Sequence, residues 1–181
     1  TLHRHKDGSL RPVLLSLKAV DLRGRTLLVG VWSDITERKR SEAAVAESRK
    51  LLQAVVDTAP VRVFWKDRDL RYLGCNPAFA ADAGKSSPAE VVGRDDFQMA
   101  WSEQAEMYRA DDRAVMETGI PKLAYEEPQT TPEGRHMWLR TSKVPLRNER
   151  GEVIGVLGIY EDATGRKRAE RHLALAVEAT G

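Results

Sequence analysis

Apolar and polar residues alternate along two parts of this chain, as they do in half-buried β-strands. The first part comprises residues 1–34, where two strand-like runs flank a glycine turn. The second part begins at residue 61, and its strands are expected at Val61–Asp67, Leu70–Asn76, Lys122–Pro128, His136–Leu146 and Val153–Asp162. A helical pattern lies between the two parts. The chain is therefore expected to hold one partial and one complete module that contain β-strands.

Helix signals separate the second and third strands of the complete module. Asn76 followed by Pro77 is a strong helix start, because Asn caps the first turn and Pro fits the first helical position. Short helices are expected from Ala78 and from Pro88, and a longer helix over residues 102–118. The order of two strands, several helices and three strands predicts an α+β domain.

A charged heptapeptide occurs twice, as DITERKR from Asp34 and as DATGRKR from Asp162, each time directly after an apolar strand. The segment LQAVVDTAP, which ends at Pro60, is similar to LALAVEATG at the end of the chain. These repeats predict four parts: residues 1–34 as the last strands of one module, 35–59 as a linker helix, 60–164 as a complete module, and 165–181 as a linker helix that enters a further module.

Each heptapeptide is predicted to start a helix that connects two modules. Asp34 and Glu37 have the spacing of a capping box, whereas Gly165 replaces the glutamate in the second copy and predicts a weaker start. The aligned linkers differ in length by one heptad, which keeps a helical face in phase. We therefore expect helices that transmit rotation or register, through the residues at their starts: Asp34, Thr36, Glu37, Asp162 and Thr164.

The first linker helix carries apolar residues at steps of three and four, which is a short seam of the a/d type. One interpretation is that the seam pairs with a helix of a second copy, and the other is that it packs on its own sheet. The two interpretations are compatible. In the first, a homodimer forms through the linker helices at Val45, Leu52, Val55 and Ala59.

Composition narrows the classes of function. Of the 181 residues, 41% are hydrophobic and 31% are charged, as in globular proteins, and the net charge of +2 gives no reason to expect nucleic-acid binding. The single cysteine, Cys75, excludes a disulfide within the chain and favours a reducing compartment. The longest apolar run, Val153–Tyr160, is far shorter than the roughly 20 residues of a membrane helix. We expect a cytoplasmic segment without a membrane span.

A series of short motifs follows in order through residues 60–168, and the series is specific although each motif alone is weak. The motifs are Phe64-Trp65-Lys66-Asp67, Asn76-Pro77-Ala78-Phe79, Val92-Gly93-Arg94-Asp95-Asp96-Phe97, Tyr108-Arg109-Ala110-Asp111-Asp112, Glu117-Thr118-Gly119, Ser142-Lys143-Val144-Pro145-Leu146, Gly155-Val156-Leu157-Gly158-Ile159 and Asp162-x-Thr164. With them the middle module resembles a PAS domain of the sensory-box type with its trailing PAC motif. Residues 3–40 resemble the end of a preceding PAS unit, and residues 169–181 the entry helix of a following one.

The resemblance implies a fold and a set of functions. The PAS fold is a five-stranded antiparallel sheet with helices on one face, enclosing a small pocket. Proteins built this way sense small molecules, redox state or light, or mediate dimerisation. They usually act upstream of a histidine kinase or of a cyclic-di-GMP enzyme such as a diguanylate cyclase. The chain departs from the family at Ala163 and Gly165, where the family prefers Ile and Glu.

Two cofactors of the family are not expected here. Haem-binding relatives use a histidine on or beside the long helix, and this module has no histidine between Pro60 and Arg135, while His136 is expected on a strand. Flavin photosensors need a cysteine after the asparagine, whereas Cys75 precedes Asn76. The identity of any cofactor therefore stays open.

The residues also give no sign of catalysis. His172 lacks the residues that follow the phosphoacceptor histidine of a kinase. The adjacent carboxylates Glu126-Glu127 and Asp111-Asp112 diverge on a strand and on a helix, so neither pair can act as an acid–base pair. We found no phosphate loop, metal-spaced cluster or nucleophile motif. The segment itself is not expected to be an enzyme.

A small-molecule site is still expected in the middle module, because ligand sites are largely apolar with a few convergent polar groups. The alternative is that the same side chains fill the core. The expected lining is Phe64, Tyr72, Asn76, Phe79, Phe97, Trp101, Met107, Tyr125, Trp138, Thr141 and Tyr160.

Two hypotheses of function follow. In the first, the module binds a small ligand or partner and relays the change through its helical linkers to an output domain of the histidine kinase or diguanylate cyclase type. In the second, it is a ligand-free dimerisation spacer.

Overall fold

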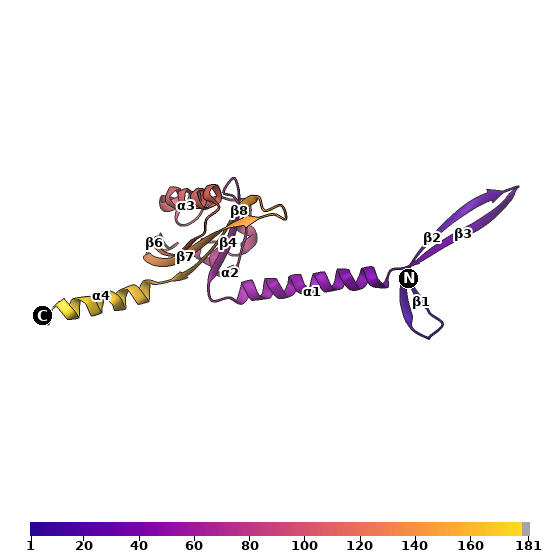
Figure 1. Ribbon diagram of the computed structural model, residues 1–181, viewed down its shortest axis with the longest axis horizontal. Helices are drawn as coiled ribbons and strands as arrows, with labels where there is room; N and C mark the ends of the chain where they lie inside the picture. The colour runs from indigo at the N-terminus through magenta and orange to yellow at the C-terminus, as the bar shows by residue number, and fades with distance from the viewer. Residues whose placement is uncertain (179–181) are drawn as a thin grey trace. The chain divides into compact units, whose positions relative to one another are not determined.

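The computed structural model describes residues 1–178, and these fall into two compact units that meet between Ala54 and Val55. The first unit holds the antiparallel strands β1 (Leu2–Arg4), β2 (Leu10–Leu22) and β3 (Arg25–Asp34), followed by most of helix α1 (Thr36–Thr58) (Figure 1). Apolar side chains of β2 and β3, including Leu17, Leu28 and Trp32, are exposed. The two long strands thus form a hairpin whose apolar residues, apart from the buried Val13, are largely open to solvent.

The second unit is built on one five-stranded antiparallel sheet, as expected. Its strands are β4 (Arg62–Asp67), β5 (Tyr72–Cys75), β6 (Lys122–Thr130), β7 (His136–Arg147) and β8 (Val153–Asp162). They lie in the order β5-β4-β8-β7-β6, so that the first and last strands of the unit are neighbours in its centre. This arrangement brings residues from both ends of the unit to the middle of one sheet.

Helices cover one face of this sheet. They are α2 (Pro77–Asp82), the 3-10 turns η1 (Pro88–Glu90), η2 (Asp96–Gln98) and η3 (Ser102–Gln104), and α3 (Ala105–Thr118). Figure 1 shows α3 crossing beside β7 and β8, which it contacts. The helix expected from residue 102 begins as the turn η3 and becomes α-helical only at Ala105, and the segment at Pro88 forms a single 3-10 turn.

Asn76 fixes the start of α2. Its Oδ1 accepts hydrogen bonds from the backbone N–H of Phe79 and from that of Val63, both at 3.1 Å. Its Nδ2 donates to the carbonyl oxygens of Val61 at 2.7 Å and Val56 at 3.1 Å. All of its hydrogen-bonding capacity is therefore used by the backbone. Asn76 ties the entry of the unit to α2 and does not present a polar group to a ligand.

Both linker helices begin in the same way. The Oδ1 of Asp34 accepts from the N–H of Thr36 at 2.8 Å, and the Oδ1 of Asp162 accepts from the N–H of Thr164 at 2.8 Å. Helix α4 (Thr164–Glu178) thus has the same aspartate cap as α1, although Gly165 stands where α1 has Glu37. Within residues 1–178, no helix combines the length and the apolar character needed to cross a bilayer.

Candidate functional site

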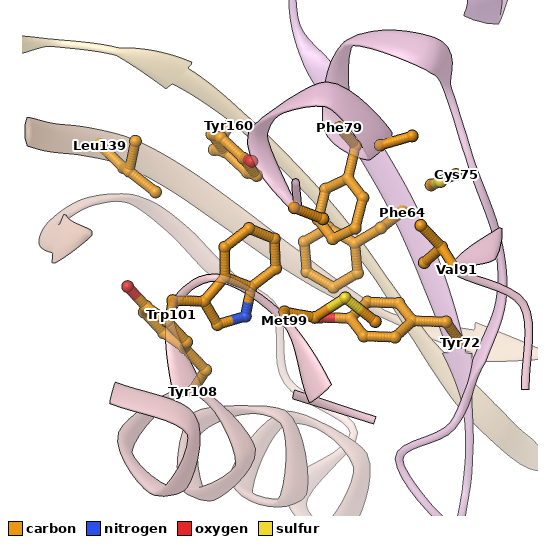
Figure 2. Packing of buried hydrophobic residues seen from close by; sticks show 12 residues of the cluster. Phe64, Tyr72, Cys75, Phe79, Val91, Met99, Trp101, Tyr108, Leu139 and Tyr160 are labelled. Atoms are coloured by element: carbon orange, nitrogen blue, oxygen red, sulfur yellow. The ribbon is translucent and has the colours of Figure 1, made fainter. Parts of the chain in front are cut away.

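An aromatic cluster fills the space between the sheet and its helices (Figure 2). Phe79 of α2 is its centre, with ring centroids 5.0 Å from Phe64, 5.3 Å from Tyr72, 5.3 Å from Trp101 and 6.0 Å from Tyr160. Most of these pairs are tilted or edge-on, which is the geometry that aromatic quadrupoles favour. The five rings leave a cavity of about 30 Å³ between them and the polar residues described below.

The structure brings together part of the expected lining. Phe64, Tyr72, Phe79, Trp101 and Tyr160 all border the cavity. Thr141 is buried, with 1% of its surface exposed. Tyr125 is only half-buried, and its ring lies 3.9 Å from the ammonium group of Lys122.

Six expected lining residues do not border the cavity, which corrects the expectation: Asn76, Tyr125 and Thr141, described above, and the three exposed residues Phe97, Met107 and Trp138. Phe97 is 52% exposed, Met107 41% and Trp138 39%. Met107 lies on the outer side of α3, because the inner side of that helix is taken by Ala105, Tyr108 and other residues at helical spacing. Phe97 stacks with the guanidinium of Arg109 at 5.2 Å, and Trp138 lies on the face of the sheet away from α3.

A cluster of four charged side chains forms one wall of the site. The Nζ of Lys66 lies 2.8 and 2.6 Å from the two carboxylate oxygens of Asp96, and 2.6 Å from Oδ2 of Asp112. The Nζ of Lys143 lies 2.6 Å from Oδ1 of Asp112. The hydroxyl of Tyr72 donates to Asp96 at 2.6 Å. The four charged residues are each no more than 1% exposed, so this is a dry network with two positive and two negative charges.

Burial and pairing act in opposite directions on these groups. Burial alone raises the pKa of Asp112, but the charges of Lys66 and Lys143 outweigh it and hold the pKa below its ordinary value of 3.8. Burial, together with the charge of Asp96, raises the pKa of the Tyr72 hydroxyl well above 10.0. Asp112 is therefore ionised and Tyr72 neutral at neutral pH. The pairing compensates the large cost of moving charges out of water.

Sequence analysis missed this cluster, although a signal for it was present. Lys66 follows Phe64 by two residues on β4, so both side chains lie on the same face of the sheet. Asp112 follows Tyr108 by four residues on α3, which places both on the inner side of the helix. Each charged residue could thus have been assigned to the core by its spacing from an aromatic residue.

Two further polar residues border the cavity without partners for their oxygen atoms. Glu127 and Gln129 lie two residues apart on β6 and are 6% and 2% exposed. Neither Oε2 of Glu127 nor Oε1 of Gln129 has a hydrogen-bond partner. Burial raises the pKa of Glu127 above 4.5 against the attraction of Lys143. The cavity therefore contains unused hydrogen-bond acceptors.

Glu126, the residue before Glu127 on β6, faces the other side of the sheet and holds the start of α4. The carboxylate of Glu126 binds the guanidinium of Arg166 at 2.6 Å and the ammonium group of Lys167 at 2.8 Å. Lys167 also lies 3.7 Å from the ring of Trp138. The N–H of Trp138 donates to Oγ1 of Thr164 at 2.9 Å. We call Glu126, Trp138, Arg166 and Lys167 the α4 anchor.

The remaining reactive groups offer no second site. Cys75 is 3% exposed, and burial raises the pKa of its thiol to about 11, which leaves it unreactive in the folded unit. Among the described residues, no three His, Cys, Asp or Glu side chains gather as a metal site would require. The cavity with its charged wall is therefore the candidate functional site.

Comparisons with known proteins agree with this architecture. A family model described as PAS fold matches residues 56–168, and a PAS domain model matches residues 1–37. Among similar curated proteins, the two-component sensor PprA of Pseudomonas aeruginosa is 30% identical over 149 residues. The methanogenesis regulatory histidine kinase FilI of Methanothrix harundinacea is 35% identical over 129 residues, and the aerobic respiration control sensor protein ArcB of Escherichia coli 28% over 130.

These matches cover 81%, 69% and 72% of this chain, but only 16%, 14% and 16% of the three relatives. Solved structures are similar in fold. VqmA of Vibrio cholera, in a complex with ligand and DNA, superposes with a TM-score of 0.58 at 24% identity, covering 61% of this chain and 50% of that one. A PAS domain from Colwellia psychrerythraea gives 0.54 at 18% identity, covering 64% and 97%. The resemblance found in the sequence is confirmed, and the chain belongs to the PAS fold family.

Proposed function

We propose that the second unit is a cytoplasmic sensory PAS module of a two-component sensor histidine kinase. In this proposal, a small ligand in the cavity changes the position of β6, and α4 carries the change to an output domain. The curated relatives favour a histidine kinase over a diguanylate cyclase as the output, because those described by function are sensors or histidine kinases.

The observation that supports this proposal is the adjacency of Glu127 and Glu126 on β6. Side chains of neighbouring residues on a strand point to opposite faces. Glu127 borders the cavity, and Glu126 binds Arg166 and Lys167 at the start of α4. A ligand that shifts Glu127 therefore acts on the same peptide segment that holds α4. Such a ligand changes the output only if it binds the two arrangements of this segment with different affinity.

Insertions behind the anchor test the relay in the longer parent kinase. An insertion of two residues after Arg168 rotates the following helix by about 200°, whereas seven residues add close to two full turns. Autophosphorylation should lose its dependence on the sensory module with two inserted residues and keep it largely with seven. Equal kinase activity of the two insertion variants would contradict a helical relay.

A substitution tests the anchor itself. Glu126→Gln removes the charge that binds Arg166 and Lys167, so it should change the kinase activity in the absence of any insertion. Glu133→Gln is the matched control, because Glu133 lies in the exposed turn after β6 and contacts only its neighbour Arg135 among the described ion pairs. If the anchor has no role in transmission, the Glu126→Gln and Glu133→Gln variants will have the same kinase activity.

A second candidate function, the dimerisation spacer, is favoured by the surface of α1. Three of the four expected seam residues, Val45, Leu52 and Val55, are 69%, 64% and 58% exposed, which leaves apolar side chains available to a second helix. The fourth, Ala59, lies after the end of α1 at Thr58 and so is not part of the helix. Leu52→Asp should abolish dimers in analytical ultracentrifugation. Lys50→Asp, which changes a residue two positions away on another side of the helix, should leave them intact. Dimers that persist in Leu52→Asp would count against the seam.

A further inference from the structure

The lysine and tryptophan donors at this site are already bound to other groups. The three protons of the Lys66 ammonium group are matched by its three short contacts with Asp96 and Asp112. The indole N–H of Trp101 points to Asp96 at 3.4 Å. Lys143 donates to the carbonyl oxygen of Tyr108 at 3.0 Å and pairs with Asp112. Two buried lysines suggest an anion site at first sight, but their charge is taken up by two aspartates.

Two hydrogen-bond acceptors of the cavity wall, in contrast, lack hydrogen-bond partners. Oε2 of Glu127 and Oε1 of Gln129 have no partner, and both side chains are more than nine-tenths buried. Buried polar atoms in folded proteins are nearly always hydrogen-bonded, so unpaired ones need an explanation. Atoms of a bound ligand would provide their missing partners.

The hairpin of the first unit carries apolar residues at positions equivalent to two polar residues of β7. Strands β2 and β3 pair in the same register as β7 and β8, because Val13 lies opposite Asp34 as Leu139 lies opposite Asp162. The residues two and four positions after Val13 in β2 are therefore equivalent to the residues two and four positions after Leu139 in β7, which are buried. The equivalent pairs are Leu15 with Thr141 and Leu17 with Lys143. The first unit thus has leucine at both positions, where the second unit has buried polar residues.

We propose, on the basis of the sensory role proposed above, that the cavity takes a small planar ligand that donates hydrogen bonds: an amide, an amidine or an N–H heterocycle. A carboxylate or phosphate would instead be repelled by Glu127 and Asp96, while the charges of Lys66 and Lys143 are taken up by the two aspartates. Planarity is favoured because the rings of Phe79 and Trp101, which meet edge to face, each offer a flat surface on which a planar group can pack. The cavity of about 30 Å³ is much smaller than the engineered cavity of about 150 Å³ that holds benzene. The ligand is therefore small, or its entry moves a ring.

Three probes with the same planar skeleton test this chemistry: acetamidine, acetamide and acetate. Each is titrated into the 181-residue chain at pH 7, and the indole N–H signal of Trp101 is followed by NMR after assignment with Trp101→Phe. Acetamidine and acetamide should shift this signal saturably. Acetate should bind at least tenfold more weakly.

Variants locate the binding to the free acceptors. Gln129→Leu should weaken both acetamidine and acetamide by fivefold or more. Glu127→Gln should abolish any advantage of acetamidine over acetamide, because it removes the charge but keeps the size. Glu133→Gln is the control, since Glu133 lies in the exposed turn after β6, outside both the cavity lining and the α4 anchor, and this variant should bind all probes as the unchanged chain does.

Two results would overturn the inference. If acetate binds as well as the donors, the cavity is an anion site, and the sensory role remains while the ligand class is wrong. If none of the three probes binds saturably, the free acceptors do not form a site for donors. The insertion experiment on the parent kinase decides the sensory role separately, because it reads the output without any of these probes.

Discussion

The buried charges allow a quantitative prediction through a double-mutant cycle on Lys143 and Asp112. Lys143→Leu leaves the cluster with one excess negative charge, and Asp112→Asn leaves it with one excess positive charge. The two changes together leave the balanced pair of Lys66 and Asp96, whose atoms lie 2.6–2.8 Å apart. Leucine is a suitable replacement because it is apolar and brings no charge into the buried site.

The magnitude follows from the burial of the pair. Asp112 is 0% and Lys143 1% exposed, so water cannot solvate the charge that remains. Breaking a buried pair by removing one partner costs about 3–5 kcal/mol, whereas replacing both partners is often close to neutral. With a urea m-value of about 2 kcal/mol/M, each single change should lower the unfolding midpoint by roughly 2 M. The double change should cost no more free energy of unfolding than either single change.

Urea unfolding at pH 7 measures this cycle. The fluorescence of Trp101, which lies in the cluster, reports on the second unit, and near-UV circular dichroism checks that the variants fold. A free-energy loss below about 1 kcal/mol for Lys143→Leu, as for an exposed pair, would refute the reasoning. So would a double variant whose loss equals the sum of the two single losses, because that result would mean that the two charges do not interact.

Two further predictions concern the sheet and the start of α4. Glu127→Gln should raise the free energy of unfolding at neutral pH. Burial raises the pKa of Glu127, so protonation of this carboxylate stabilises the native state of the unchanged chain. This stabilisation is complete below pH 4.5 and is lost as the pH rises through the raised pKa. Thermal unfolding from pH 4 to 8 should therefore show a difference between the variant and the unchanged chain that grows with pH, and a constant difference would contradict the assignment. Gly158→Ala should cost about 1–3 kcal/mol in urea unfolding, because a Cβ there would lie 2.1 Å from the ring of Phe64. Gly165→Ala is its control: no atom lies within 4 Å of a Cβ at that helical position, and alanine should stabilise α4 by up to about 1 kcal/mol.

The period of two along the strands and the repeated heptapeptide predicted most of the elements from sequence alone. The pairing of β4 with β8 could not be derived that way, because it joins segments about 90 residues apart and depends on the whole sheet. This strand pairing was part of the expected fold only because of the resemblance to the PAS family. The expected site was partly misplaced because aromatic residues were assigned inward by type, and Phe97 and Trp138 show that such residues also lie on the surface.

The charged wall was missed for a related reason. Asp111 and Asp112 were considered as a possible pair with each other, and the geometry of a helix excludes that pair. The actual partner of Asp112 is Lys66, 46 residues earlier on a different element. Composition gives no hint of such a contact, although the spacing of Lys66 from Phe64 indicates which face it occupies. A contact between two elements can be derived only once the fold is known, whereas the face of a helix or strand on which a residue lies follows from its spacing along the sequence.

The two charge clusters on either side of β6 differ in their access to water, and this difference has a consequence for signalling. The Lys66–Asp112 pair is 1% and 0% exposed, whereas the side chains of Glu126, Arg166 and Lys167 are 30%, 47% and 32% exposed. Dissolved ions screen exposed charges over about 8–10 Å and act much less on buried ones. Under the proposed relay, ionic strength would therefore leave ligand recognition nearly unchanged while it weakens transmission to α4. The salt concentration of the surroundings would change how strongly a bound ligand alters the output, without changing which ligand the module binds.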